Sequence, residues 1–256
     1  MLDPQSALLL AAAGLAAGFV DAIAGGGGLL TVPALLAVGL PPPMALGTNK
    51  LQSVCGTALA AVSYGRAGLF SWGKLAGGIV ITALAAAAGA GAVLHLQPDF
   101  LRRIIPVLLI GIAAYFWWKP ELGGTARAPR MRRAWFAWVF GVGLGFYDGF
   151  FGPGAGSFWM VACVLLAGLD LRAAVGHTKV MNLASNAGSL VVFLTCGQVH
   201  FEIAAVMIAG QLIGARLGSG LVIRRGAKFV RPAFLLVVLL LAARLVWQQW
   251  AAASAQ

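Results

Sequence analysis

Apolar residues dominate the chain in ten runs, separated by short polar or glycine- and proline-containing gaps. The runs cover residues 6–24, 28–40, 44–64, 75–96, 101–118, 134–151, 155–169, 172–196, 202–223 and 229–250. Most are long enough to cross about 30 Å of hydrocarbon as a helix. The second and seventh runs are too short to do so comfortably, and each follows a glycine-rich break. The pattern predicts an all-α integral membrane protein with about eight hydrophobic spans and up to ten helical segments.

The composition agrees with a protein that uses lipid as its solvent. The chain is 61% hydrophobic and 10% charged, which is more apolar surface than a soluble domain of this length can bury. Its 18 basic and 7 acidic residues give a net charge of +11, and the basic residues lie mostly in the gaps. The positive-inside rule explains this distribution better than nucleic-acid binding does. The three cysteines are dispersed, so we expect no metal and no cofactor.

The same polar interruptions occur twice along the chain. Each half has an aspartate, then a glycine-rich break, then a lysine, all within apolar sequence. An offset of 129 residues superimposes Lys50 on Lys179, and an offset of 127 superimposes Asp21 on Asp148. We therefore predict two related halves with a site between them, as in many membrane transporters. The predicted division is an N-terminal membrane repeat at 1–118, a cytoplasmic linker at 119–133 and a C-terminal membrane repeat at 134–256.

The distribution of basic residues indicates whether the repeats are parallel or inverted. Suppose that the first segment of each half enters the membrane and returns to the same side, and that three helices then cross it. The second half is then inverted relative to the first. Twelve Lys and Arg residues then share one face, in loops 65–74, 119–133, 170–172 and 224–231, against two on the other. Four simple spans per half would give seven against seven. Because insertion favours a strong bias, we predict two inverted repeats with broken or re-entrant first segments, each followed by three transmembrane helices.

The glycine breaks are the first candidates for binding. Gly25–Gly28 and Gly152–Gly156 cannot hold a regular helix, and unwound backbone in lipid must be buried in protein or line a wet cavity. A helix that restarts after such a break points free N–H groups and its positive dipole end at the cavity, which suits an anion. Close helix packing through small residues is the structural alternative.

Charged residues beside the breaks are the second set of candidates. Asp21 and Asp148 each lie four residues before a break, where they either cap the broken helix or carry a proton. Lys50 and Lys179 lie roughly 10–14 Å into the membrane and share a helix face with polar neighbours. They either contact an anion or snorkel to the interface. The predicted substrate-binding residues are Gly27, Gly28, Thr48, Asn49, Lys50, Ser53, Gly154, Ala155, His177, Thr178, Lys179 and Asn182.

These motifs resemble those of the sulfite exporter TauE/SafE family, also called the 4-toluene sulfonate uptake permease family. The resemblance rests on Gly18–Gly28, Gly47–Ser53, Gly145–Gly156 and Gly176–Asn182, and it extends through both halves. It implies a multi-pass transporter in the bacterial inner membrane that carries small sulfur-containing anions such as sulfite, sulfonates or sulfoacetate. In the second half Gly-His-Thr-Lys replaces Gly-Thr-Asn-Lys.

The leading hypothesis is therefore a secondary transporter, not an enzyme, with a small anion bound between the repeats. Its partners would be that anion and the lipid bilayer, with proton coupling through Asp21 and Asp148, and no nucleic acid. A passive anion channel is one alternative. A membrane-embedded enzyme or assembly factor of sulfur metabolism is another, although no nucleophile or metal motif is present to support it. The sequence assigns no oligomeric state.

Overall fold

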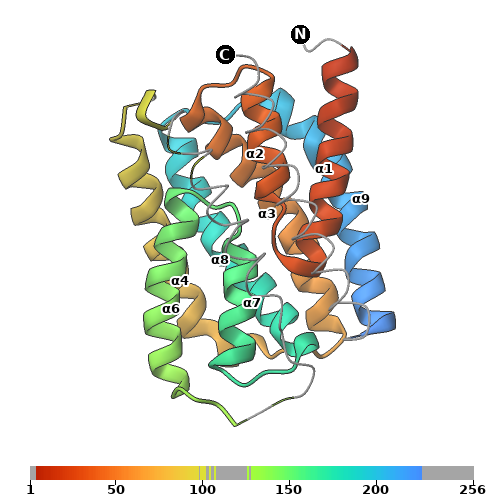
Figure 1. Ribbon diagram of the computed structural model, residues 1–256, viewed down its shortest axis with the longest axis vertical. Helices are drawn as coiled ribbons and strands as arrows, with labels where there is room; N and C mark the ends of the chain where they lie inside the picture. Colours follow the sequence, from red (N-terminus) through yellow and green to blue (C-terminus); the bar gives the residue numbers. More distant parts are fainter. Residues whose placement is uncertain are drawn as a thin grey trace.

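The computed structural model describes residues 4–97, 99–101, 104, 107, 126 and 128–226, and these residues form a bundle of helices (Figure 1). The first half contributes α1 (Pro4–Ala24), α2 (Gly28–Ala37), α3 (Pro42–Arg66) and α4 (Trp72–Leu94). The second half contributes α6 (Arg133–Phe150), α7 (Ala155–Leu165), α8 (Leu171–Thr195) and α9 (Phe201–Arg225). Most of the predicted run at 101–118, the whole run at 229–250 and most of the linker at 119–133 lie outside the described residues.

Three of the described helices, α1, α4 and α9, are long and apolar enough to cross a membrane. Two short helices, α2 and α7, have 10 and 11 residues and follow the glycine breaks, as the sequence predicts. Helices α3 and α8 have 25 residues each, but they carry the buried polar side chains of the site. The described part of the chain is thus that of an all-helical, multi-pass membrane protein.

The two glycine breaks meet inside the bundle. Figure 1 shows α1 and α2 as a hairpin in the upper part of the molecule, and α6 and α7 as a hairpin in the lower part. At the tips, the Ser157 hydroxyl at the start of α7 donates to the carbonyl oxygens of Ala24 and Gly25, at 2.9 and 3.0 Å. A methyl group on Gly28 would lie 3.2 Å from Pro153 Cα. The unwound backbone is therefore enclosed by protein, as lipid requires.

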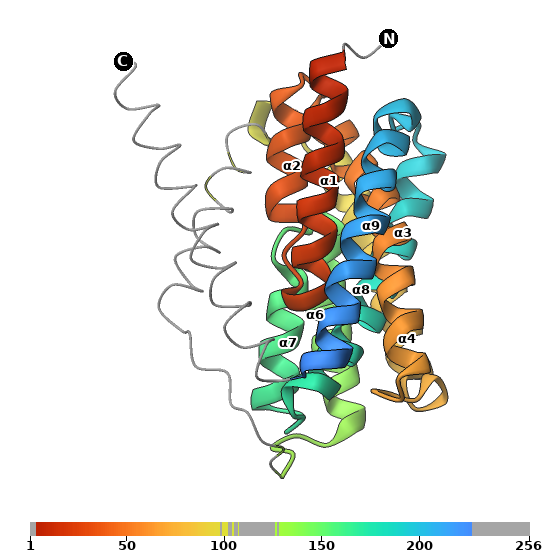
Figure 2. The same cartoon turned by 90° about the vertical axis from the view of Figure 1, so that its right-hand side faces the viewer.

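The helices of the two halves are interleaved. Helix α1 packs along α9, and α6 packs along α4, while α3 contacts both α8 and α9 (Figures 1 and 2). Glycines permit this close approach, since a methyl group on Gly18 would overlap the Gln211 carbonyl, and one on Gly149 would overlap the Ala86 carbonyl. Each half therefore supplies the packing surface for the first helix of the other.

The basic connections contact one another at one end of the bundle, here called the linker end because it contains residues 128–132. Arg133 donates to the carbonyl oxygen of Lys74, and Arg172 donates to that of Ile223 at 3.1 Å. The Arg130 N–H donates to the Leu166 carbonyl oxygen at 2.9 Å. Four connections that are far apart in sequence thus lie at one end of the bundle.

Candidate functional site

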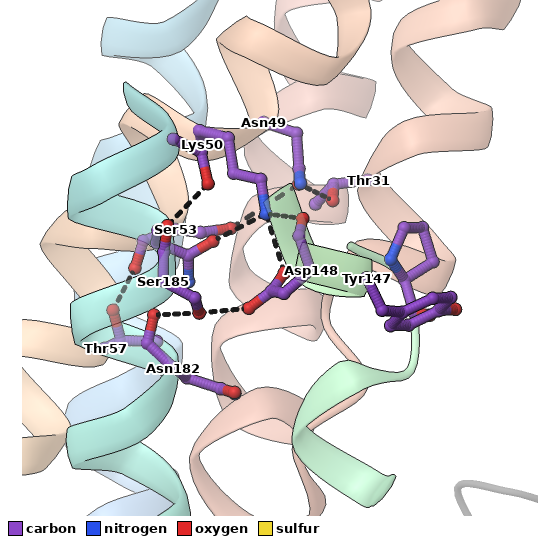
Figure 3. A network of polar contacts seen from close by, with 12 residues as sticks. Thr31, Asn49, Lys50, Ser53, Thr57, Tyr147, Asp148, Asn182 and Ser185 are labelled. Carbon is purple, nitrogen blue, oxygen red and sulfur yellow. Dashed lines mark hydrogen bonds and ion pairs between the residues drawn. The ribbon is translucent and has the colours of Figure 1, made fainter. Parts of the chain in front are cut away.

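Lys50 of α3 forms a buried ion pair with Asp148 of α6. Its Nζ lies 2.6 Å from Asp148 Oδ1, and the two side chains are 1% and 5% exposed. The same ammonium also donates to the Asp148 backbone carbonyl and, at 3.2 Å, to Asn186 Oδ1. Ser185 donates to the other carboxylate oxygen, so that Asp148 lies between Lys50 and Ser185 (Figure 3). All three donor positions of the ammonium are therefore used.

Lys179 of α8 forms the corresponding pair with Asp21 of α1. Its Nζ lies 3.0 Å from Asp21 Oδ2, and the side chains are 0% and 13% exposed. The lysine of each half is thus paired with the aspartate of the other half. The opposite charges of each pair offset part of the desolvation cost of burying them.

This pairing bears on the roles drawn from the sequence for the four charged residues. Snorkelling is wrong for Lys50 and Lys179, because both ammonium groups lie inside the protein. The N-cap residues of α2 and α7 are Gly27 and Gly154, which have no side chain to cap the helix. The Asp21 and Asp148 carboxylates accept from the lysines, and the capping and proton-carrying roles of these aspartates stay predictions.

A hydrogen-bond network fixes Asn49, the neighbour of Lys50. The Asn49 Oδ1 atom accepts from the Thr31 hydroxyl of α2 and, at 3.0 Å, from Gln52 Nε2. Ser53, one turn further along α3, donates weakly to the same oxygen at 3.5 Å. The amide oxygen is therefore occupied, which leaves the Asn49 NH₂ group as the donor available to a ligand.

A small polar pocket of about 20 Å³ lies between the two hairpin tips and is here called the central pocket. Its volume accommodates about one water molecule, so an oxyanion with three or four heavy atoms requires the surrounding groups to move apart. The positive φ angles of Gly25, Gly152 and Gly154 shape its wall, and L side chains rarely adopt them. The residues that line it are Asp21, Gly25, Gly26, Gly27, Gly28, Asn49, Ser53, Asp148, Gly152, Gly154, Ala155, Gly156, Asn182 and Asn186.

The structure separates the predicted binding residues into two groups. The central pocket brings together Gly27, Gly28, Asn49, Ser53, Gly154, Ala155 and Asn182. Lys50 and Lys179 do not line it, but each forms an ion pair with an aspartate that does. Three predicted residues lie elsewhere. The Thr48 hydroxyl accepts from the His200 N–H at 2.9 Å, away from the pocket, and His177 lines a different cavity. Thr178 is buried in α8 but does not line the pocket.

Sequence reasoning missed four polar residues of the site. Asn186 lies one turn beyond Asn182, the same spacing by which Ser53 follows Asn49, so the helix-face argument could have found it. Ser185 and Gln52 lie close to predicted residues on their helices. Ser185 donates to Asp148, and Gln52 donates to Asn49. Ser157 carried no signal, because its hydroxyl bonds to the backbone of the other half.

The comparisons with known proteins cover almost the whole chain. The family model described as sulfite exporter TauE/SafE matches residues 10–245. The probable membrane transporter protein YfcA of Escherichia coli strain K12 is 42% identical over 247 residues, which span 96% of this chain and 92% of that protein. A probable membrane transporter protein of Haemophilus influenzae is 39% identical over 241 residues, or 94% of each chain.

A more distant relative is the probable membrane transporter protein YjnA of Bacillus subtilis strain 168. It is 25% identical over 241 residues, which span 86% of this chain and 94% of that protein. No solved structure matches the chain. The match over residues 10–245 includes both glycine breaks and both lysines, the features on which the resemblance was argued. The chain therefore belongs to the sulfite exporter TauE/SafE family.

Proposed function

We propose that the protein is a secondary transporter of small sulfur-containing anions, such as sulfite, sulfonates or sulfoacetate, in the bacterial inner membrane. The observation that carries the proposal is the pair of crossed, buried ion pairs at the tips of two glycine-broken hairpins. Charged residues within membrane segments are costly to bury, and they mark substrate or ion pathways. The names of the relatives, probable membrane transporter proteins, support the same class of function.

The proposal includes an inverted-repeat architecture. Its support is a reciprocal packing of the two halves. In the repeat, α6 corresponds to α1 and α9 corresponds to α4, and the structure packs α1 against α9 and α6 against α4. The hairpins that reach the centre from opposite parts of the bundle agree with it (Figure 1). Rocking of one repeat against the other would then expose the central pocket to each face of the membrane in turn.

The ion pairs suggest how an anion is bound. A bound oxyanion would take the place of an aspartate carboxylate beside Lys50 or Lys179, and backbone N–H groups at the starts of α2 and α7 would complete its coordination. The displaced carboxylate would be left without its cation, which is unfavourable in a buried site. Protonation of Asp21 or Asp148 removes that cost, so one proton would accompany the anion. The small central pocket favours such an exchange over a permanently open anion channel.

The test is uptake of labelled sulfite by proteoliposomes that contain the parent protein, Lys50→Ala or Lys179→Ala. We expect each variant to lose at least about tenfold in flux, since a lost charge-assisted contact is worth roughly 1.5–3 kcal/mol. Arg66→Ala, at the linker end of α3 and outside both pockets, is the matched control and should retain flux. Undiminished flux in both lysine variants would refute the proposal, and failure of a pH gradient to drive uphill accumulation would identify a channel instead.

A further inference from the structure

A second and larger cavity, of about 620 Å³, opens at the linker end. Its walls come from both halves and include the aromatic residues Phe70, Phe136 and Trp159. Lys74, Arg132 and Arg133 lie at the exposed rim, and no carboxylate is present among the described residues that line it. The cavity thus combines a cationic rim with an apolar interior, which suits an anion with an organic part.

The cavity lies next to the central pocket along helix α8. Met181 lines the cavity, and its neighbour Asn182 lines the central pocket. The Met181 sulfur also accepts a hydrogen bond from Thr82 of α4 at 3.6 Å. One turn of α8 therefore forms part of the wall between the two spaces, and Met181 is a flexible side chain that can change rotamer to open it.

The opposite end of the bundle is closed at the equivalent position. The 129-residue offset relates Gly47 to Gly176 and Gln198 to Leu69. A methyl group on Gly47 would overlap the Gln198 carbonyl oxygen. One on Gly176 would lie 3.0 Å from Phe70 Cδ1, 3.1 Å from Leu69 Cβ and 3.6 Å from the Leu69 carbonyl oxygen. The backbones of the repeat-related elements thus approach more closely at the Gly47 end, while side chains fill the space beside Gly176.

A hydrogen bond shows the same asymmetry. The Thr48 hydroxyl accepts from the His200 N–H at 2.9 Å, which ties the start of α3 to the start of α9. The offset relates these residues to His177 and Ser71, and both of those line the large cavity. His177 instead bonds through Nδ1 to the Ala173 carbonyl oxygen of its own helix, at 2.9 Å.

We infer that the large cavity is the entrance for the anion from the linker end, and that the Thr48–His200 contact is the gate that closes the other end. In the alternate state the two contacts exchange: the start of α8 closes on Ser71, and the start of α3 separates from His200. The inference rests on the proposed transport function, and it assigns the linker end as the side that is open in this structure. Two packings of one pair of repeats are the kind of discrete states on which alternating access depends.

The first test measures disulfide formation in a chain whose three native cysteines are replaced by alanine. We expect Thr48→Cys/His200→Cys to cross-link at least about tenfold faster under mild oxidant than Ser71→Cys/His177→Cys, because the resting population favours the linker-open state. The 48–200 cross-link should block flux, and a reductant should restore it. Equal cross-linking rates for the two pairs would overturn the inference.

The second test uses a single reporter, Ala137→Cys, whose side chain lines the cavity. Gly47→Leu should force the start of α3 away from Gln198 and so favour the alternate state, in which the cavity is closed. Maleimide labelling of this cysteine should then slow at least about tenfold. Gly143→Leu, on the same helix as the reporter and with nothing within 4 Å of its new Cβ among the described residues, is the control and should leave labelling unchanged. Equal labelling in both folded variants would contradict the inference. The cross-linking and labelling rates are measured without substrate. An absence of sulfite flux alongside the expected asymmetry in these rates would therefore refute only the substrate assignment.

Discussion

At the scale of single residues, the two ion pairs differ in how fully the protein surrounds them. Asp148 accepts from Lys50 and Ser185, and Lys50 also donates to Asn186. Asp21 accepts from Lys179 at a longer distance, and its side chain is more exposed. Since desolvation sets the cost of an unpaired charge, breaking the first pair should cost more than breaking the second.

We therefore expect Asp148→Asn to lower the free energy of unfolding by about 3–5 kcal/mol, because it leaves the Lys50 ammonium buried without a counter-charge. Asp21→Asn is the matched variant and should cost less. Adding Lys50→Gln to Asp148→Asn should recover most of the stability but none of the transport. Thermal unfolding in detergent, with flux measured in parallel, checks both parts. A double variant as unstable as Asp148→Asn alone would contradict this account.

The sequence identified the members of these pairs but not the pairing. Asp21, Lys50, Asp148 and Lys179 stand out because apolar segments exclude charge unless it has a use. Their partners are 98 and 158 residues away in the chain, and a repeat pattern relates equivalent residues without saying which of them touch. The pattern therefore predicted lysines whose ammonium groups are free to contact an anion. In the folded protein each lysine instead forms an ion pair with the aspartate of the other half.

At the scale of helices, the glycine content has two separate physical uses. At the breaks, glycines adopt left-handed backbone that other residues avoid, as at Gly25 and Gly154. Along α6, glycine at position 149 instead lets the helix approach the backbone of α4, while Gly143 on the same helix faces open space among the described residues. The sequence alone does not distinguish these uses.

The difference can be measured with one substitution at two positions. Gly149→Ala should destabilise the protein by about 1–3 kcal/mol, because the new methyl group overlaps the Ala86 carbonyl and forces α4 and α6 apart. Gly143→Ala should be neutral or stabilising by up to about 1 kcal/mol, since alanine favours the helix and meets nothing there. Melting temperatures in detergent provide the test. A shift of the same sign and size for both variants would refute the packing argument.

Helix positions were the most predictable part of the fold. Apolar runs ended at glycine, proline or charged residues, and the described helices begin and end within a few residues of those limits. The short second and seventh runs correspond to α2 and α7 for the same reason. Packing partners were not predictable, because an apolar helix in lipid has no polar face to indicate which side meets its neighbours.

At the scale of the whole molecule, the predicted halves are continuous in sequence but interleaved in space. Helix α1 of the first half has its main packing surface on α9 of the second. A half made alone would expose the glycine-rich face of that helix, and it would bury Lys50 or Asp148 without a counter-charge. We therefore expect the two halves to depend on each other to fold.

Cutting the chain between residues 124 and 125 tests this dependence. We expect fragments 1–124 and 125–256, when co-expressed, to co-purify through a tag on either one, because the contacts between halves hold them together. Each fragment expressed alone should aggregate or be degraded. Size-exclusion chromatography in detergent, followed by sulfite flux of the reassembled pair, measures both outcomes. A monodisperse fragment 1–124 on its own would show that the halves fold independently.

The neutrality of the crossed ion pairs also has an electrical consequence. Moving one elementary charge through a potential of 100 mV changes its energy by about 2.3 kcal/mol. Two buried lysines without their acids would make the return of the empty carrier strongly dependent on voltage. With Asp148 and Asp21 held against them, these four groups contribute no net charge, so the cell's resting voltage would neither drive nor oppose that step. Any electrogenicity of the cycle would then come from the cargo and the proton proposed to accompany it.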